Sequence, residues 1–340
     1  MGDRRGIATV GTWCVDFNKS IADWPAEDTT NEVLAMDRQG GGSACNMAID
    51  LKRLDPAFPV ETMGVIGDDD NARFLLAQCD AFGVLREGLV SLPGGATMSV
   101  DAFNVLSTGR RTHFYHQGVA ALMNPEHFDF SRSRARFLHL GLPGAHVRMD
   151  APWRGEANGW VVALRAARQC GLATNLELMS TSRDKLAALA RPCLPHLDML
   201  IVNDFEIGAL ADVETRDSSG ANAKAVARAV DAALSLGAMG LVVAHFPEGA
   251  IAATREGGRF ALGSLAMPGE AIAGVNGAGD AFAAGLLYGL HEGWPIEAGL
   301  RLGHACAAAS MRAVSTTARV APVAECLALA EKWGLRPAPA

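Results

Sequence analysis

The sequence has no apolar run that approaches the roughly 18 residues needed to span a bilayer, and it has no block of basic residues. Its formal net charge is −7, because 37 acidic residues outnumber 30 basic ones. An acidic chain without a basic block is a poor partner for nucleic acid or for an anionic membrane surface. The apolar stretch before Gly11 is too short for a signal-peptide core. We therefore expect a cytoplasmic protein that binds neither nucleic acid nor membrane.

Cysteine pairs at metal-binding or redox spacing are also missing. The seven cysteines include no C-x-x-C, which is typical of isolated, reduced thiols in a cytoplasmic protein. Aromatic residues make up only 6% of the chain. Hydrophobic residues make up 49% and charged residues 20% of the 340 residues, an ordinary globular composition that excludes a disordered or fibrous chain.

Short apolar runs alternate with longer helical patterns along most of the chain. This alternation predicts a parallel sheet covered by helices on both faces. The expected strands are 7–11, 60–65, 136–140, 172–176, 197–202 and 240–244. The expected helices are 44–54, 71–82, 160–169, 221–236 and most of 278–333.

Two segments, at about 12–37 and 96–118, break this alternation because neither contains a crossover helix. The second holds two short strand patterns joined by residues 107–110, which are typical of a hairpin turn. We expect both segments to leave the main sheet and to form a small β cap over one end of it.

The sharpest motif is a glycine-rich turn at 274–279 that runs directly into a helix of small residues. Backbone N–H groups at a helix start form an anion site, and glycines let a phosphate approach closely. Asp280 would place a carboxylate at that site, where it could accept a proton from a hydroxyl that attacks a phosphate. The alternative is that Asp280 caps the helix. Phe282 stands where a dinucleotide-binding G-x-G-x-x-G needs glycine, and there is no P-loop motif.

Two further motifs favour ligand contacts. Gly41 and Gly42 lie in a three-glycine turn that opens a helix carrying Asn46, an amide that can donate and accept hydrogen bonds. The alternative is an ordinary loop before a capped helix. Asp16 follows the first strand, and its carboxylate can accept bonds from the neighbouring hydroxyls of a sugar. Asp16 could equally be a turn residue.

Asn203 and Glu206 follow an apolar strand, at the end where open α/β sheets bind ligands. An amide and a carboxylate suit a hydrated Mg²⁺, which prefers oxygen ligands and retains several waters. The alternative is a capping box, in which Asn203 caps the helix and Glu206 closes the box. The spacing alone favours neither.

Together these motifs resemble the ribokinase-like, or pfkB, family of carbohydrate kinases, from Gly11 to about Ser315 and in that family's order. The resemblance implies one α/β domain over residues 1–340, with a central, mostly parallel sheet flanked by helices and a small β-sheet lid. It also implies ATP-dependent phosphorylation of a hydroxyl on a sugar or similar small molecule, with Mg²⁺ as cofactor.

The resemblance assigns roles by position. Asp280 matches the family's general base, and the backbone amides of Gly277, Ala278 and Gly279 match its anion hole. Asn203 and Glu206 match the motif that organises Mg²⁺, through water, and phosphate. The residues that match the substrate-binding positions are Asp16, Gly41, Gly42 and Asn46.

The sequence departs from the family pattern in three places. Residues 274–276 lack the usual Asp-Thr-Thr, whose aspartate often helps bind a monovalent cation, so a dependence on K⁺ is in doubt. The usual Thr-Leu-Gly-x-x-Gly is replaced at 244–249, where His245 and Gly249 remain as candidates for nucleotide contact. Residues 175–178 replace an Asp-x-Asn-x-Arg stretch, so no arginine reaches the phosphates from there.

The substrate itself stays open. The set Asp16, Gly42 and Asn46 suits several hydroxyls at once, which favours a monosaccharide or sugar acid. A nucleoside kinase of the adenosine or inosine type is the alternative, with a base platform among Trp13, Phe17, Phe103 and Phe114. A third reading, a catalytically silent binding protein, is disfavoured by the intact Asp280. An exposed lid sheet also invites a homodimer through the lid.

Overall fold

The computed structural model describes residues 4–218, 220–313 and 316–340, and its centre is one nine-stranded sheet. The strand order is β15-β14-β13-β10-β9-β8-β1-β4-β5. Neighbouring strands from β13 to β5 run parallel, whereas β14 and β15 are antiparallel at one edge. The strands are β1 (Ile7–Gly11), β4 (Val60–Ile66), β5 (Leu85–Ser91), β8 (Phe137–Gly141), β9 (Ala173–Leu176), β10 (Met199–Asn203), β13 (Leu241–Phe246), β14 (Gly249–Thr254) and β15 (Arg259–Gly263).

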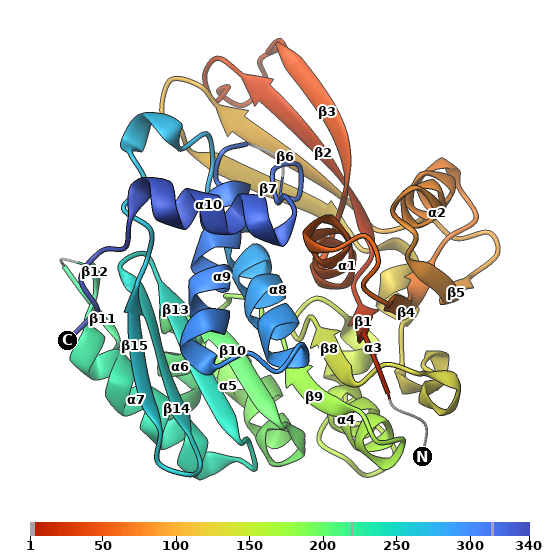
Figure 1. Ribbon diagram of the computed structural model, residues 1–340. Coiled ribbons are helices and arrows are strands. Elements are labelled where there is room, and N and C mark those ends of the chain that lie inside the picture. Colours follow the sequence, from red (N-terminus) through yellow and green to blue (C-terminus); the bar gives the residue numbers. More distant parts are fainter. Residues whose placement is uncertain (1–3, 219, 314–315) are drawn as a thin grey trace.

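Helices cover both faces of this sheet (Figure 1). One layer comprises α1 (Ser43–Leu54), α2 (Asp70–Phe82), α8 (Ala278–His291), α9 (Ile296–Ser310) and α10 (Val323–Trp333). The other comprises α3 (Val147–Asp150), α4 (Gly159–Gln169), α5 (Arg183–Ala190), α6 (Asp204–Ala211) and α7 (Ala223–Leu236). Successive side chains of a strand point to opposite faces, so Ile7 packs in one core while Ala8 and Val10 pack in the other. The expected mostly parallel sheet between two helical layers is confirmed.

A second sheet of four strands, in the order β3-β2-β6-β7, projects from the end of β1 (Figure 1). Its strands are β2 (Cys14–Ile21), β3 (Ala35–Gly41), β6 (Ser99–Val105) and β7 (Arg111–His116). β6 and β7 form the expected antiparallel hairpin, and β2 pairs parallel with β6. The two segments that broke the alternation therefore meet in one sheet, and its role as a lid stays a prediction.

The structure adds elements that the sequence patterns did not predict. β5, α5 and the pair β14–β15 were not expected. β14 reads Gly-Ala-Ile-Ala-Ala-Thr, and such small residues carry little β propensity. The segment 244–249, expected as a loop, is mostly strand: it contains the end of β13 and the start of β14, and only Pro247 and Glu248 form the tight turn between them.

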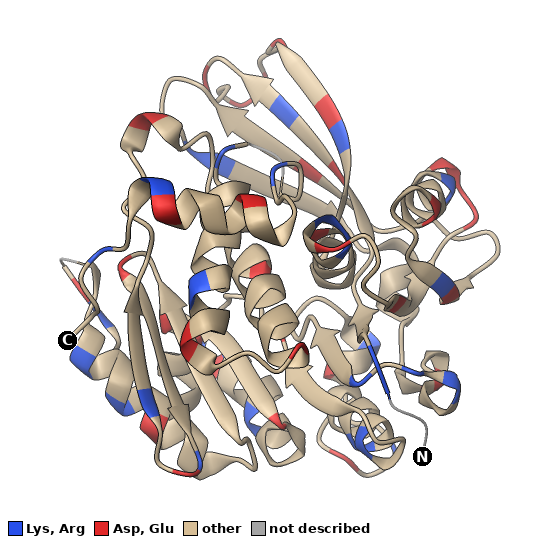
Figure 2. Cartoon of the chain, in the orientation of Figure 1, with Lys and Arg blue, Asp and Glu red and all other residues tan. Residues whose placement is uncertain are grey.

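Charged residues lie mainly on the helices, on the turns and on the four-stranded sheet, and the central strands of the large sheet are mostly uncharged (Figure 2). The sequence of α8 contains a single Asp, Glu, Lys or Arg, which is Asp280. No helix in the described part of the chain is long and apolar enough to cross a membrane. An acidic group on an otherwise apolar core helix is costly to bury, so its surroundings need an explanation.

Candidate functional site

The helix α8 begins after a glycine whose backbone is in the left-handed conformation. Gly277 has φ 75°, and a Cβ there would lie 2.7 Å from the carbonyl oxygen of Thr316. Only glycine adopts this conformation without strain and fits this contact. The first N–H groups of the helix, at 277–280, have no carbonyl partner within it and carry the positive end of the helix dipole. This geometry suits the expected anion hole of Gly277, Ala278 and Gly279, which stays a prediction.

Asp280 lies in the first turn of α8 and contacts α1. The Asn46 amide nitrogen donates a hydrogen bond of 2.8 Å to Oδ2 of Asp280. The Thr316 hydroxyl lies 3.3 Å from the other end of the amide, Oδ1 of Asn46. The structure therefore brings together Asp280 and Asn46, which are 234 positions apart in the chain.

A second carboxyl, which the sequence analysis did not single out, lies against Asp280. Glu177 follows β9, and its carboxyl lines the same small cavity as that of Asp280. Loss of solvent in the cleft, and then the charge of Glu177, raise the pKa of Asp280 to about 7. Loss of solvent and the charge of Glu206 raise the pKa of Glu177 to about 8. Such shifts are frequent at catalytic sites.

Asn203 and Glu206 form the capping box of α6. Oδ1 of Asn203 accepts from the Glu206 N–H at 2.9 Å, and Oε2 of Glu206 accepts from the Asn203 N–H at 3.0 Å. The Ser180 hydroxyl donates to Oε1 of Glu206 at 2.9 Å. Burial raises the pKa of Glu206 to about 7. The capping geometry is thus present, and a role with Mg²⁺ stays a prediction, because a carboxylate can accept more bonds than these two.

Asp16 lies on β2, beside the glycine-rich turn. A Cβ on Gly41 would lie 2.3 Å from Oδ2 of Asp16, so this carboxylate needs a glycine opposite it. Burial raises the pKa of Asp16 to about 6, and the charge of Asp280 adds to the rise. Gly42 is the N-cap of α1, the helix that carries Asn46. The four predicted substrate-binding residues therefore share one corner of the site.

Arg111, which sequence reasoning missed, faces the same corner from β7. Strand register pairs Arg111 with Asn104 and Asn104 with Ser20, which lies on the same face of β2 as Asp16. The Arg111 charge lowers the pKa of Asp16, against the stronger effect of burial. The side chain of Arg111 is half-buried, with Nε near Oδ1 of Asn104.

The aromatic residues considered as a base platform do not share that face. Along the strands, the positions of Phe17, Phe103 and Phe114 alternate with those that share a face with Asp16. These three rings therefore point to the opposite side of the four-stranded sheet. Phe103 and Phe114 pack there with the half-exposed Trp24. Trp13 is 1% exposed and donates to Thr62 in the core.

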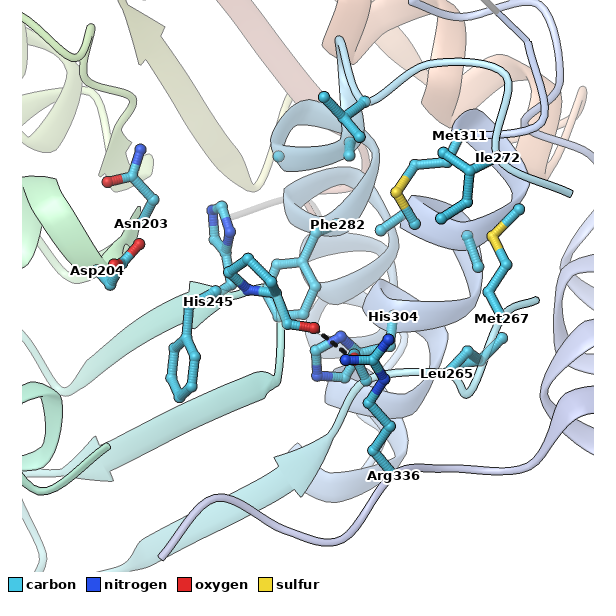
Figure 3. A pocket seen from close by; sticks show the side chains of 18 of the residues that line it. Asn203, Asp204, His245, Leu265, Met267, Ile272, Phe282, His304, Met311 and Arg336 are labelled. Carbon is cyan, nitrogen blue, oxygen red and sulfur yellow. Dashed lines mark hydrogen bonds between the residues drawn. The ribbon is translucent and has the colours of Figure 1, made fainter. Parts of the chain in front are cut away.

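On the other side of the α8 turn is an apolar cavity of about 370 Å³ (Figure 3). Phe282 packs between two imidazole rings, with centroids 4.9 Å from both His245 and His304. Burial lowers the pKa of His245 to about 4 and that of His304 to about 3, so both rings are neutral near pH 7. Its other apolar lining residues include Leu265, Met267, Ile272, Ala308 and Met311. The cavity has the size and lining of a pocket for a flat heterocycle.

A smaller cavity of about 110 Å³ adjoins the first, because Asn203, His245 and Gly279 line both. Its acidic lining is Glu177, Glu206 and Asp280. Gly249, the other nucleotide-contact candidate, lies elsewhere. It is buried at the start of β14, where a Cβ would lie 2.3 Å from the carbonyl oxygen of Leu262.

The residues of the site that the sequence analysis missed differ in whether the sequence carries a signal for them. Glu177 directly follows a strand, so the rule that identified Asn203 could also have found it. Arg111 carries no such signal, because its place depends on how β2, β6 and β7 pair. Phe282 was noted only as a residue that breaks a glycine motif.

Comparisons with known proteins agree with this geometry. The model of the pfkB family of carbohydrate kinases matches residues 4–323. The 5-dehydro-2-deoxygluconokinase of Geobacillus thermodenitrificans is 26% identical over 88% of this chain and 85% of its own length. The ATP-dependent ribose-1-phosphate kinase of Halopiger xanaduensis is 28% identical over 89% of this chain and 90% of its own length.

Solved structures show the same fold. Arabidopsis thaliana ribokinase, complexed with ribose and ATP, aligns with a TM-score of 0.76 and 19% identity over 96% of this chain and 99% of that one. A putative ribokinase II from E. coli, in complex with ATP and Mg²⁺, aligns with a TM-score of 0.78 and 17% identity over the same shares. The expected ribokinase-like architecture is therefore confirmed.

Proposed function

The chain belongs to the pfkB family of carbohydrate kinases, and from that membership we propose that it transfers the terminal phosphoryl group of ATP to a hydroxyl of a monosaccharide that carries an acidic group. The observation that supports this proposal best is the position of Asp280. It lies at the start of α8, between the apolar cavity on one side and the Asp16 corner on the other.

Asp280 is the proposed general base. Its carboxylate would take the proton of the acceptor hydroxyl as that oxygen attacks phosphorus, and the Asn46 amide holds the carboxylate in place. The N–H groups of Gly277, Ala278 and Gly279 would stabilise the negative charge on the transferred group. Backbone donors at a helix start need no rearrangement during the reaction, which makes them efficient.

The apolar cavity is the proposed site for the adenine of ATP. Its neutral rings of His245, Phe282 and His304, which are inclined to one another, form an apolar, desolvated wall, and Gly279 lies between this cavity and the smaller acidic one. His245 therefore keeps its expected role in nucleotide binding, whereas the position of Gly249 favours a structural one.

The carboxylate of Glu206 and the amide of Asn203 fit a hydrated Mg²⁺, because both line the acidic cavity. We propose that they hold its waters, as the capping contacts leave acceptor capacity on Glu206. The ion would supply positive charge that offsets the phosphates of ATP. The replaced Asp-Thr-Thr at 274–276 keeps K⁺ out of this proposal.

The acceptor is expected in the corner formed by Asp16, Gly41, Gly42 and Asn46. Arg111 adds a cation to this corner, and a guanidinium recognises carboxylate or phosphate by paired hydrogen bonds. Two relatives act, by their names, on a gluconate derivative and on ribose 1-phosphate, both of which are anionic sugars. A sugar acid or sugar phosphate therefore fits the site better than a neutral sugar.

The four-stranded sheet is the proposed lid of a single domain, because its Asp16 face borders the acceptor corner. Its other face exposes Phe114 at 54% and Trp24 at 49%. Exposed aromatic surface of this kind favours a partner, and we propose a second copy of this chain, lid to lid. Measurement of the solution mass tests this, with Phe114→Ser expected to lower it to that of one chain.

Release of ADP across a panel of acceptors tests the proposed function. The panel should contain sugar acids, sugar phosphates, the matching neutral sugars and nucleosides. We expect at least about a tenfold higher kcat/KM for an acidic sugar than for its neutral counterpart, the usual value of one charged contact. Arg111→Gln should remove this preference while leaving the KM for ATP within about twofold. Nucleosides that outperform every sugar would refute the acceptor, and no ADP release at all would refute the kinase activity.

A further inference from the structure

The far end of α8 borders a hollow that lies away from the apolar and acidic cavities. It has a volume of about 670 Å³, and three separate segments of the chain line it. They are the chain before β1, the residue before β8 and the end of α8, and they contribute Arg4, Arg5, Arg136, His291, Glu292 and Gly293. α8 has 14 residues, so about 20 Å separate this hollow from the start of the helix. A molecule bound in the hollow would therefore contact neither ATP nor the acceptor.

The hollow contains more positive than negative charge. Three of the residues that line it are arginines, and among its described lining residues Glu292 is the one carboxylate. Nε2 of His291 accepts a hydrogen bond of 2.7 Å from the backbone N–H of Gly6, so the proton of this ring lies on Nδ1. Nδ1 lies 2.8 Å from Oε1 of Glu292 and donates to it. His291 is therefore neutral and adds no charge of its own.

Two of the three guanidinium groups are held in place by backbone carbonyls. Nη1 of Arg4 donates to the carbonyl oxygens of Ser133 and Ala135, at 3.1 and 2.9 Å. Nη1 of Arg136 donates to the carbonyl oxygen of His291 at 2.8 Å. Within the described part of the chain, no carboxylate forms an ion pair with Arg4 or Arg136. A carbonyl fixes the position of a guanidinium without neutralising it, so these two positive charges are fixed and uncompensated.

Arg5 is the third cation and the least restrained of the three. Its side chain is 60% exposed, and its Nη2 lies 3.5 Å from Oε2 of Glu292. A contact of this length between exposed groups is weak and contributes little to stability. Arg5 can therefore turn toward another anion at little cost, while the two fixed arginines stay in position.

We propose that this hollow is a second anion site, which binds a phosphate group through Arg4, Arg5 and Arg136. Guanidinium groups recognise phosphate by paired hydrogen bonds, and three cations against one carboxylate match its charge of up to two units. The whole chain has a net charge of −7 and does not attract anions in general, so the attraction comes from these local cations. The volume also admits the rest of a small phosphate ester.

Titration calorimetry with inorganic phosphate at constant ionic strength tests this site. Arg5→Gln and Arg136→Gln each remove one cation, and we expect the Kd for phosphate to rise by at least about tenfold in each, the scale of one charged hydrogen bond. Arg73→Gln is the matched control, because Arg73 is similarly exposed and also contacts a carboxylate, that of Asp70. It should leave the Kd within about twofold of wild type. Thermal unfolding checks that each variant is folded, and the exposed Arg5→Gln decides the test if Arg136→Gln does not fold.

Phosphate can also bind at the start of α8, where it would compete with ATP. The three variants leave that end of the helix intact, so an ATP-sensitive Kd should be the same in all of them. Glycerol phosphate as a second titrant distinguishes the sources of the phosphate group, since tighter binding than that of inorganic phosphate identifies an ester as the occupant and weaker binding identifies the free ion. A Kd that Arg5→Gln leaves unchanged, or phosphate binding that ATP abolishes entirely, would overturn the proposal and leave the arginines as anchors of the N-terminal segment.

Discussion

The two adjoining cavities differ in their lining, which is mostly apolar in one and acidic in the other, although both exclude solvent from ionisable groups. In the apolar cavity, burial lowers the pKa values of His245 and His304, and the neutral rings become part of a hydrophobic wall. In the acidic cavity, loss of solvent raises the pKa values of Glu177, Glu206 and Asp280 into the neutral range. The physical cause is the same, because loss of solvent always disfavours the charged form.

The outcome differs because the starting values differ. A histidine whose pKa is lowered stays neutral throughout the physiological pH range. A carboxyl whose pKa is raised into that range can exchange protons near pH 7. The apolar cavity should therefore respond to changes of shape and the acidic one to changes of charge. The following substitutions test this division.

The largest effect is expected at Asp280. Asp280→Asn keeps the shape and the backbone N–H groups but cannot accept the proton, so kcat should fall by at least about a hundredfold. Binding of ATP, measured by titration calorimetry, should change by less than about threefold, because the proposed anion site consists of backbone N–H groups. Turnover close to that of wild type would show that another group is the base.

A change of shape in the apolar cavity should act on ATP alone. Phe282→Leu removes the ring between His245 and His304 while keeping an apolar side chain. We expect the KM for ATP to rise by about tenfold, the usual scale for the loss of an aromatic wall, with the acceptor KM nearly constant. An increase in the acceptor KM instead would place the acceptor in this cavity, and thermal unfolding controls for lost stability.

A smaller change is expected in the dependence of the rate on Mg²⁺. Glu206→Gln preserves the capping box, since glutamine also closes it, but removes the negative charge. The Mg²⁺ concentration for half-maximal rate should rise by about fivefold, while the melting temperature stays within about two degrees. If the Mg²⁺ dependence stays constant, Glu206 serves only as a cap.

The smallest effect concerns stability. The pKa of Asp16 is raised to about 6 in the folded protein, so its protonated form is favoured by folding and its contribution is complete below pH about 4. That contribution is lost as the pH rises through about 6. Asp16→Asn should therefore raise the melting temperature by a few degrees at pH 8 and leave it nearly unchanged at pH 4, as scanning calorimetry can measure. An equal gain at both pH values would contradict the raised pKa.

The sequence by itself determined the features that depend on local order. The alternation of strand and helix predicted a sheet covered on both faces, because hydrophobic spacing reports which side chains are buried. The glycine turn before Asp280 and the pair Asn203 and Glu206 were identified because each motif lies within a few consecutive residues. Asn203 and Glu206 could also be placed at the end of a strand, where open α/β sheets bind ligands.

Only the tertiary structure decided which of these groups meet. Asn46 and Asp280 are joined by a 2.8 Å hydrogen bond across 234 positions, and Glu177 is held by His139 across 38. The place of Arg111 depends on strand register, and a shift of one residue would turn it to the opposite face. Sequence periodicity carries no information on such long-range contacts, because it records burial and not partners. The pKa values of the carboxyl groups in the site therefore depend on tertiary packing, since each one is set by the groups that folding places around it.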